Sequence, residues 1–523
     1  MLLRALISSL LICLAQVASG QEVVIGRADL VPSGLPGLAI ARPLDRPATP
    51  RPAALAGIAE GIPGARLLNS LVARGKAQGL DGILYENRDR GHSTLSAEAF
   101  PGLTFLSFDK ALKGEGFDYG LAGKVVVEGP LIGNSSTALT RGPFARSLTR
   151  LAMTSRLGAE IAQRQYAADS LYIYPEHRDH DGRDLYPAIW PYTINSQGSS
   201  GSDQPIIRAL LMTLAGFTAE TRARLVETHQ LAPALQMILR RNLLGVDSDA
   251  DYMTALAHPS AIDGTTLRPE RMIAQAAAMR PDQLPPPLRI EVEEETFRTA
   301  AGLTGKSEIL FTTPQAIARL WRAGDWAREM MISAQSDPVA EGQSLRFHWV
   351  LLRGDPEKVW ITRLDEAGSR ARLRIAWHDE FALPGRETRL TSRVDIGVFA
   401  ETGAAVSAPA YVSVAFPTHQ KREYLPGPDG AMRLVSVNYN AAGRSTEFDP
   451  RLFWTGAWRD EMRYDAEGQL AGWQRHDEGP GGAGQGGQRV TDFAADGRLR
   501  DGRIVRYAPV NPALPMVLDW RAE

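Results

Sequence analysis

Four short polar segments hold the side chains of this chain that are best suited to catalysis or ligand binding. Each follows a short apolar run, and the segments cover residues 86–93, 133–137, 176–181 and 195–203. If the apolar runs are parallel strands, the segments leave the same edge of one sheet and converge there. The sequence therefore predicts a single polar site built from all four.

The third segment is the richest in titratable groups. Its histidines and aspartates suit a general base with an orienting acid, or the nitrogen and oxygen ligands of a divalent cation as cofactor. The predicted catalytic residues are His177, Asp179, His180 and Asp181, and the predicted metal ligands are His177, His180 and Asp181. The spacing matches no established zinc signature. Internal pairing with Arg178 and Arg183 is the alternative, and both interpretations stay open.

The fourth segment leads directly into a predicted helix. Free backbone amides and the helix dipole attract an anion at such a place, for example phosphate, sulfate or a substrate carboxylate. The predicted ligand-binding residues here are Ser199, Ser200, Gly201, Ser202 and Asp203. Alternatively, Asp203 caps the helix and fills the amide site itself. The segment is not a P-loop, because no lysine follows its glycines.

The first two segments supply further candidates for substrate binding. These are Asn87, Arg88, Arg90 and His92 in the first, and Asn134 and Ser135 in the second. The two arginines could clamp an acidic group of a substrate, or they could lie in a salt-bridged surface turn.

A serine nucleophile is a further hypothesis. Ser135 or Ser136 would be the nucleophile, with His92 or His177 as its base. No nucleophile-elbow pattern surrounds these serines, so the motif alone does not favour it.

The elements that must position these segments are short strands that alternate with helices, as in an α/β domain. The predicted strands are Gly82–Tyr85, Lys124–Val127, Leu171–Tyr174 and Tyr192–Ile194. A helix follows Asp203, with Asp203 as its cap and Pro205 in its first turn. Further helices are predicted from Thr218, over Ala232–Leu244 and over Arg268–Met279.

After Pro285–Pro287 the pattern becomes that of β-structure. The predicted strands are Leu288–Val292, Arg346–Leu352, Lys358–Ile361, Arg370–Ile375 and Tyr411–Ala415, interrupted by one helical insert over Pro314–Met331. Strands at this spacing are typical of a β-sandwich.

Three stretches in this half carry a resemblance to known modules. Ser333–Pro338, Leu345–Trp349 and Gly354–Pro356 together resemble the pattern of PKD-like and immunoglobulin-like modules of exported bacterial proteins. The resemblance lacks the glycine-rich aspartate turn of those modules after Pro338, and it implies a spacer or binding module.

Near the C-terminus, Arg463–Leu470 and Asp492–Leu499 are similar to the YD-type β-hairpin repeats of bacterial surface proteins. More widely, Pro175–Asp181 and Gln197–Asp203 resemble an uncharacterised family of exported bacterial proteins. That resemblance implies no activity.

The N-terminus reads as a secretory signal. Arg4 precedes an apolar run, and small residues near Gly20 suit cleavage. An uncleaved anchor or a lipoprotein on Cys13 is the alternative. Cys13 is the only cysteine, so a mature chain would have no disulfide. No later apolar stretch is long enough to span a membrane. A formal charge of −2 argues against nucleic acid as the main partner.

We expect a multidomain protein with an N-terminal α/β domain, an all-β immunoglobulin-like sandwich and a β-hairpin tail. The expected regions are a signal peptide (1–20), an extended Pro-rich segment (21–56), an α/β domain with the candidate site (57–284), a PKD/immunoglobulin-like domain with a helical insert (285–418) and a β-hairpin-rich region (419–523).

The functional hypothesis is a periplasmic or secreted hydrolase acting on a polar polymer, with a glycan favoured. The competing hypothesis is a non-catalytic surface or adhesion protein, in which the same segments bind a glycan, an anionic small molecule or a cation. Metal analysis and substitution of His177 and Asp181 separate the two.

Overall fold

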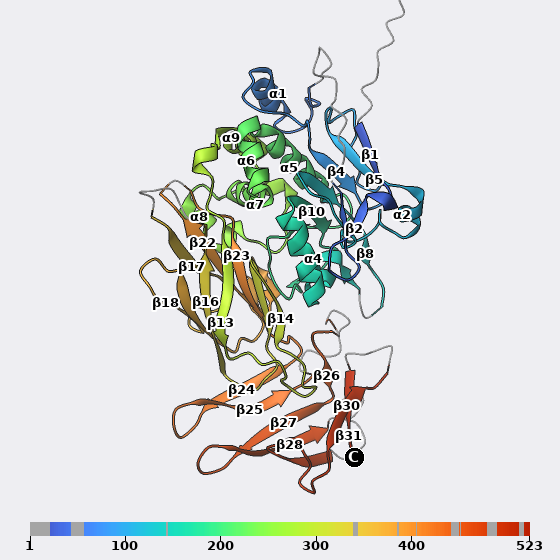
Figure 1. The fold of residues 1–523 in the computed structure, drawn as a ribbon. Coiled ribbons are helices and arrows are strands. Elements are labelled where there is room, and N and C mark those ends of the chain that lie inside the picture. Colours follow the sequence, from blue (N-terminus) through green and yellow to red (C-terminus); the bar gives the residue numbers. More distant parts are fainter. Residues whose placement is uncertain are drawn as a thin grey trace, which may run out of the picture.

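The computed structural model describes residues 21–42, 57–142, 145–337, 344–383, 386–403, 405–440, 449, 451–477, 489–511 and 517–523. The expected signal peptide lies outside these residues. An α/β body, a β-sandwich and a C-terminal β-region follow one another along the molecule (Figure 1). Within the described residues, no helix is long and apolar enough to cross a membrane.

The α/β body is built on one six-stranded sheet with the order β1-β5-β4-β7-β10-β12. All five strand pairings are parallel. The strands are β1 (Gln21–Ile25), β4 (Leu84–Asn87), β5 (Thr104–Phe108), β7 (Leu131–Asn134), β10 (Ser170–Pro175) and β12 (Thr193–Ser196). The expected α/β fold class is therefore confirmed for this part.

Three strand predictions needed correction. Residues 21–25 form the edge strand β1 and are not part of an extended surface segment. Strand β5 was not predicted. The run Lys124–Val127 contains only the short β6 (Val125–Val126), which pairs with β3 (Ala39–Ala41) in a separate small sheet with β2 (Leu30–Pro32). The second polar segment instead follows β7.

Helices cover one face of the sheet because Tyr85, Ile132 and Ile173 point their apolar side chains there. The helices of the body are α1 (Ala65–Ala73), α2 (Lys110–Gly114), α3 (Leu148–Met153), α4 (Arg156–Ala167), α5 (Gln204–Gly216), α6 (Ala219–Glu227), α7 (Leu231–Arg241), α8 (Asp249–Tyr252) and α9 (Pro269–Ala278). On the other face, Leu84 and Tyr172 pack against α2 and the small sheet.

The helices predicted between residues 203 and 279 are confirmed, except for the cap predicted for the first of them. Pro205 lies in the first turn of α5, and Thr218 caps α6 by accepting a hydrogen bond from the Thr221 amide. Asp203 precedes α5, but its carboxylate makes no capping hydrogen bond. It is turned toward β7, as described below.

The second part is a sandwich of two sheets around one apolar core. One sheet has the order β13-β16-β19-β18 and the other β14-β15-β23-β22-β17. The strands are β13 (Arg289–Glu295), β14 (Ile309–Thr313), β15 (Ala316–Leu320), β16 (Ala327–Gln335), β17 (Arg346–Arg353), β18 (Val359–Arg363), β19 (Arg370–Ala376), β22 (Arg393–Glu401) and β23 (Ala410–Ala415). The helical insert predicted over Pro314–Met331 is wrong, because β15 and most of β16 occupy it.

The third part continues the β-structure. Its sheets have the orders β24-β25-β27-β28-β29 and β26-β31-β30. The strands are β24 (Lys421–Pro426), β25 (Met432–Asn438), β26 (Thr455–Gly456), β27 (Trp458–Tyr464), β28 (Leu470–Asp477), β29 (Arg489–Ala494), β30 (Val505–Pro509) and β31 (Val517–Ala522). The hairpin predicted over Arg463–Leu470 joins β27 to β28.

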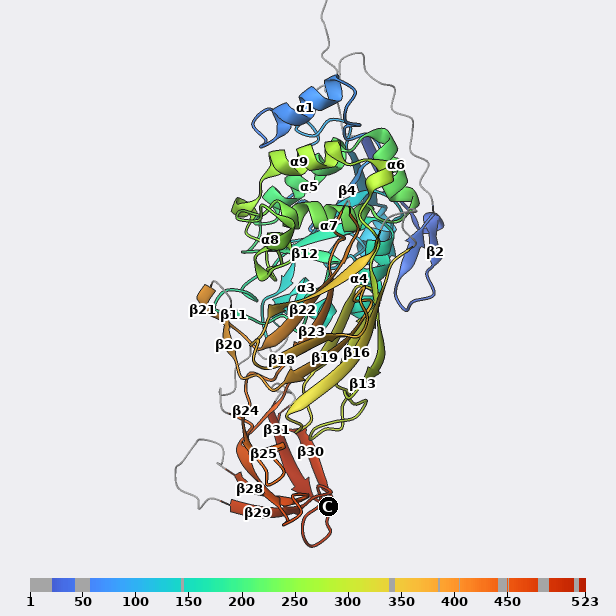
Figure 2. The ribbon, with the colours of Figure 1, turned by 90° about the vertical axis from the view of Figure 1, so that its left-hand side faces the viewer.

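The α/β body and the sandwich share a buried polar interface. Short β11 (Arg183–Asp184) pairs in parallel with β21 (Arg386–Thr391), which also pairs with β20 (Phe381–Leu383), and Figure 2 shows β11 beside β21. Arg393 of β22 contacts the carboxylates of Asp184 and Asp395 at 2.9 Å each. All three of these side chains are buried, so the interface is fixed by charge pairing as well as by apolar packing.

Candidate functional site

The strand order of the main sheet reverses between β4 and β7. From β4 the chain adds β5 on one side, whereas β7, β10 and β12 follow one another on the other side. In open α/β sheets, such a reversal leaves a crevice at the carboxyl ends of the two central strands. The first polar segment leaves β4 here and the second leaves β7.

A buried polar network joins the two strands to the start of α5. The Tyr85 hydroxyl donates to the side-chain oxygen of Asn134 at 2.8 Å. The side-chain amide of Asn134 donates to the Asp203 carboxylate at 2.6 Å. Burial raises the pKa of Asp203, and the hydrogen bond from Asn134 partly offsets the rise. Asn134 and Asp203 thus hold three loops together from below and do not face solvent.

Above this network, a serine, a histidine and an aspartate meet. The distance from Ser136 Oγ to His92 Nδ1 is 3.0 Å, and His92 Nδ1 lies 3.3 Å from the Asp89 carboxylate. The Ser136 hydroxyl also donates to Asp89. Thr137 Oγ1 donates to the other oxygen of Asp89 at 2.9 Å. We call these four residues the Ser136 cluster. It combines a hydroxyl, an imidazole and a carboxylate, the groups that serve in nucleophilic catalysis.

The first segment is folded tightly around Asn87. The side-chain oxygen of Asn87 accepts hydrogen bonds from the amides of Asp89 and Gly91, and its side-chain nitrogen donates to the His92 carbonyl. Arg90 has a φ of 50°, a left-handed conformation that non-glycine residues rarely adopt. Asn87 is therefore a positioning residue for this loop.

Backbone strain is concentrated in the polar segments. Besides Arg90, the left-handed non-glycine residues of the described chain include Ser93, His177 and Arg178, with φ values of 55°, 47° and 76°. Such residues cost free energy and cluster at binding and catalytic sites. The strain supports the assignment of a functional site to this edge of the sheet.

His177 and Glu176 attach the third segment to its neighbours. His177 Nε2 lies 2.7 Å from the carbonyl oxygen of Ser136. The buried Glu176 carboxylate accepts hydrogen bonds from the amides of His180 and Gly198 at 2.9 and 3.0 Å. Burial raises the pKa of Glu176 to about 7. The third segment therefore supports the Ser136 cluster from the side.

An open hollow lies over the Ser136 cluster. It is lined by Asp89, Arg90, Gly91, His92, Tyr119, Ser136, Thr137, Ala138 and Ser200. Its lining is mostly polar, and three of the four polar segments contribute to it. Of the four segments predicted to form one site, the first, second and fourth line the hollow, and the third does not.

Two of the predicted catalytic residues lie elsewhere. Asp179 is buried, where it pairs with Arg150 at 3.0 Å and accepts a hydrogen bond from the Ser147 amide at 2.7 Å. His180 is buried 3.8 Å from Asp184, at the interface with the sandwich. Burial lowers the pKa of His180, and Asp184 partly offsets this. The contacts of both residues stabilise the fold, and neither side chain lines the hollow.

The predicted metal site does not form. His180 is buried, Asp181 is exposed, and His177 contacts the backbone of Ser136. Among the residues that the structure describes, no group of three or more His, Cys, Asp or Glu side chains lies close enough to hold a metal ion. The predicted divalent-cation site on His177, His180 and Asp181 is therefore wrong, because these three side chains do not meet.

Arg88 does not clamp a substrate. Its side chain is fully buried and pairs with Glu86 at 2.6 Å on the face of the sheet that packs against the small sheet. Ser135 is also buried, with its hydroxyl 3.4 Å from the Arg88 carbonyl. Of the two candidate nucleophiles, only Ser136 lines the hollow.

The fourth segment contributes less than predicted. Ser200 lines the hollow, but Ser202 Oγ is bonded to Ser196 Oγ at 2.8 Å, and Ser199 and Gly201 are exposed without lining it. The buried Asp203 carboxylate is turned toward Asn134, and its negative charge lies close to the start of α5, where it would repel an anion. The geometry therefore does not favour the predicted anion cradle.

Asp89 and Tyr119 line the hollow but were not predicted as site residues. Asp89 lies inside the first segment, so the sequence alone could have predicted it as a site residue. Tyr119 comes from a turn-rich stretch after α2 and reaches the hollow through a β-bridge with Asp89. That contact depends on the fold, and no motif around Tyr119 indicates it.

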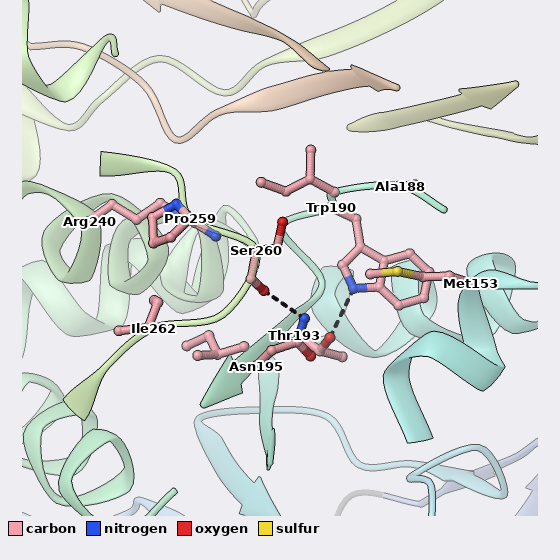
Figure 3. Close-up of a pocket in the computed structure, with 11 residues that line it drawn as sticks. Met153, Ala188, Trp190, Thr193, Asn195, Arg240, Pro259, Ser260 and Ile262 are labelled. Carbon is pink, nitrogen blue, oxygen red and sulfur yellow. Dashed lines mark hydrogen bonds between the residues drawn. The ribbon is translucent and has the colours of Figure 1, made fainter. Parts of the chain in front are cut away.

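A second space lies inside the molecule, beside β12 (Figure 3). At about 10 Å³ it has the volume of about one water molecule. Asn195 donates to the Ser260 carbonyl at 2.9 Å beside it, and Trp190 donates to Thr193 at 2.9 Å. It is too small for a substrate.

Comparison with known proteins adds no assignment to this site. No protein-family model matches the sequence, and no curated protein matches it either.

Proposed function

We propose that the chain is an exported hydrolase that removes acyl groups from a polar polymer, most favourably a glycan, with Ser136 as nucleophile. The observation that carries the proposal is the contact of Ser136 Oγ with both His92 and Asp89 at the strand-order reversal. Serine nucleophiles with a histidine and an acid perform acyl transfer, whereas glycosidic cleavage uses a pair of carboxylates.

The proposed reaction has two steps. Ser136 Oγ attacks the acyl carbon while its proton passes to the Asp89–His92 pair, and the pair returns a proton to the departing alcohol. Water then attacks the acyl-enzyme in the same way and releases the acid. Asn87 positions the loop that carries both partners of the serine.

Several features support a polymeric, polar substrate outside the cytoplasm. The hollow is open, so a long chain can pass across it, and its lining is mostly polar. The N-terminal sequence has the pattern of a secretory signal, which supports a periplasmic or secreted protein. We also propose that the sandwich is an immunoglobulin-like module, on the basis of its resemblance in sequence.

One observation favours the alternative, a non-catalytic ligand-binding protein. Ser136 and Asp89 contact the same nitrogen of His92. In the usual serine triad the nucleophile and the acid contact opposite nitrogens of the histidine.

Covalent labelling tests the proposal. The wild-type protein, Ser136→Ala and the exposed-serine control Ser199→Ala are incubated with a fluorophosphonate and with a panel of acetylated oligosaccharides. We expect labelling of Ser136 in the mass spectrum, and a loss of ester hydrolysis of roughly 1,000-fold or more in Ser136→Ala only. Full hydrolysis by Ser136→Ala, or no labelling and no hydrolysis by the wild type, would overturn the proposal.

A further inference from the structure

An arginine stacked on a tyrosine forms one rim of the hollow. The Arg90 guanidinium lies 4.6 Å from the centre of the Tyr119 ring. The Arg90 side chain is 59% exposed and Tyr119 is 44% exposed. Tyr119 is among the large hydrophobic residues that the chain leaves in solvent. An exposed aromatic ring beside an exposed guanidinium offers a stacking face and hydrogen-bond donors to a bound ligand.

The fold holds this pair in place. Asp89 and Tyr119 form a β-bridge, and the amide of Gly120 donates to the Arg88 carbonyl at 3.0 Å. Arg90 is kept in its left-handed conformation by the hydrogen bonds of Asn87 to the amides on either side of it. Arg90 therefore lies in a hydrogen-bonded turn, and Tyr119 lies in the segment that forms a β-bridge with that turn.

One positive charge lies at this rim of the hollow. Arg90 is the one lysine or arginine among the residues that line the hollow. Its nearest acid, Asp118, is 3.8 Å away, too far for a strong hydrogen bond. The Asp89 carboxylate is occupied by Ser136, Thr137 and His92. The Arg90 side chain is therefore more than half exposed and its ion pair with Asp118 is long, which leaves it accessible to an anionic group of a ligand.

We infer that Arg90 and Tyr119 form a binding subsite for an acidic sugar unit of the substrate. Arg90 would pair with the sugar carboxylate in a bidentate manner, and Tyr119 would stack on the sugar ring. This inference rests on the proposed function and specifies its substrate class: an acylated glycan that carries carboxylates near the acylated unit.

Matched substrates test the inference. Hydrolysis is measured on an acetylated oligogalacturonate and on an acetylated neutral oligosaccharide of equal length, for the wild type, Arg90→Gln, Arg90→Lys, Tyr119→Leu and the control Arg66→Gln on α1. We expect the wild type to prefer the acidic substrate in kcat/KM. Arg90→Gln should reduce that preference about tenfold, mainly through KM, and Arg90→Lys should retain part of it. Arg66→Gln should keep the wild-type preference.

A binding measurement separates the two proposals. The Ser136→Ala protein is titrated with deacetylated oligogalacturonate and with the neutral oligosaccharide, with and without Arg90→Gln. Tighter binding of the acidic chain that depends on Arg90 supports the subsite even if no ester is hydrolysed. Ser136-dependent hydrolysis without any acidic preference, or a preference that Arg90→Gln leaves unchanged, would overturn the subsite and leave the hydrolase proposal standing.

Discussion

At the scale of single residues, the chain uses buried carboxylates for several different purposes. Asp203 braces the candidate site, Asp184 pairs with arginine across the interface, and Asp169 caps a helix. Asp169 accepts hydrogen bonds from the amides of Leu231 and Ala232, both on the same oxygen. Burial raises the pKa of Asp169 to about 7. Its charged form is therefore disfavoured in the folded protein.

The Asp169 carboxyl should make stability depend on pH. Because its folded pKa is above its unfolded value of 3.8, its contribution is fully present below about pH 4 and is lost as the pH rises to about 7. A shift of this size corresponds to roughly 4 kcal/mol across the window. Asp169→Asn keeps the accepting oxygen and should flatten the pH dependence of the unfolding free energy, measured by urea titration at pH 4–8. An unchanged slope would contradict the assigned cause.

At the scale of elements, the sequence predicted the strands and helices whose apolar residues recur at the spacing of the element that they form. Strands β10 and β12 and helices α5, α6 and α9 lie where the sequence placed them. A helix was wrongly predicted over residues 314–331, because alanine, arginine and leucine at helical spacing favour a helix. In the fold these residues form β15 and β16, and tertiary packing in the sandwich outweighs their local preference.

The candidate site was predictable in part. The rule that loops converge at the carboxyl edge placed His92, Ser136 and Ser200 in one region before any geometry was known. The same rule could not separate buried from exposed members of a loop, so Arg88 and His180 were assigned to the site. Burial of one side chain depends on which face of its strand it occupies and on distant segments that cover it.

The close packing of β7 against β10 gives a prediction for these strands. A Cβ atom at Gly133 would overlap the ring of Tyr172, whose hydroxyl donates to Glu86 at 2.6 Å. Gly133→Ala should lower the unfolding free energy by about 1–3 kcal/mol, because an overpacked core must shift. It should also reduce ester hydrolysis, since Ser136 follows the same strand. Gly182→Ala is the control, because no atom lies within 4 Å of its Cβ position. Equal stability of the two variants would contradict the overlap.

At the scale of the whole molecule, the α/β body and the sandwich behave as one packed unit. Arg393 bonds to Asp184 and Asp395, and the His258 ring lies 3.0 Å from the Tyr411 hydroxyl across the same interface. The arginine holds the pKa of Asp184 well below its usual range. The chain just after the third polar segment is thus joined to the sandwich side of this interface.

Replacing Arg393 should weaken the interface between the α/β body and the sandwich. Arg393→Met leaves the buried carboxylates of Asp184 and Asp395 with Arg353 as their remaining arginine and should cost about 3 kcal/mol, with the body and the sandwich still unfolding in one transition. Tryptophan fluorescence and far-UV circular dichroism during denaturation would report both parts. Arg370→Met breaks an exposed pair with Glu293 and should change the midpoint little. Two separate transitions in the wild type would contradict a shared unit.

The pairing of β11 with β21 also sets an order of events during synthesis. Strand β11, which comes just after the third polar segment, leaves the ribosome about two hundred residues before its partner strand does. Until that partner emerges, β11 has no strand of the sandwich side to pair with, although every residue that lines the hollow, from Asp89 to Ser200, has already been made. Such distant pairings slow folding. The contact between the α/β body and the sandwich can therefore close only after the chain has extended through β21.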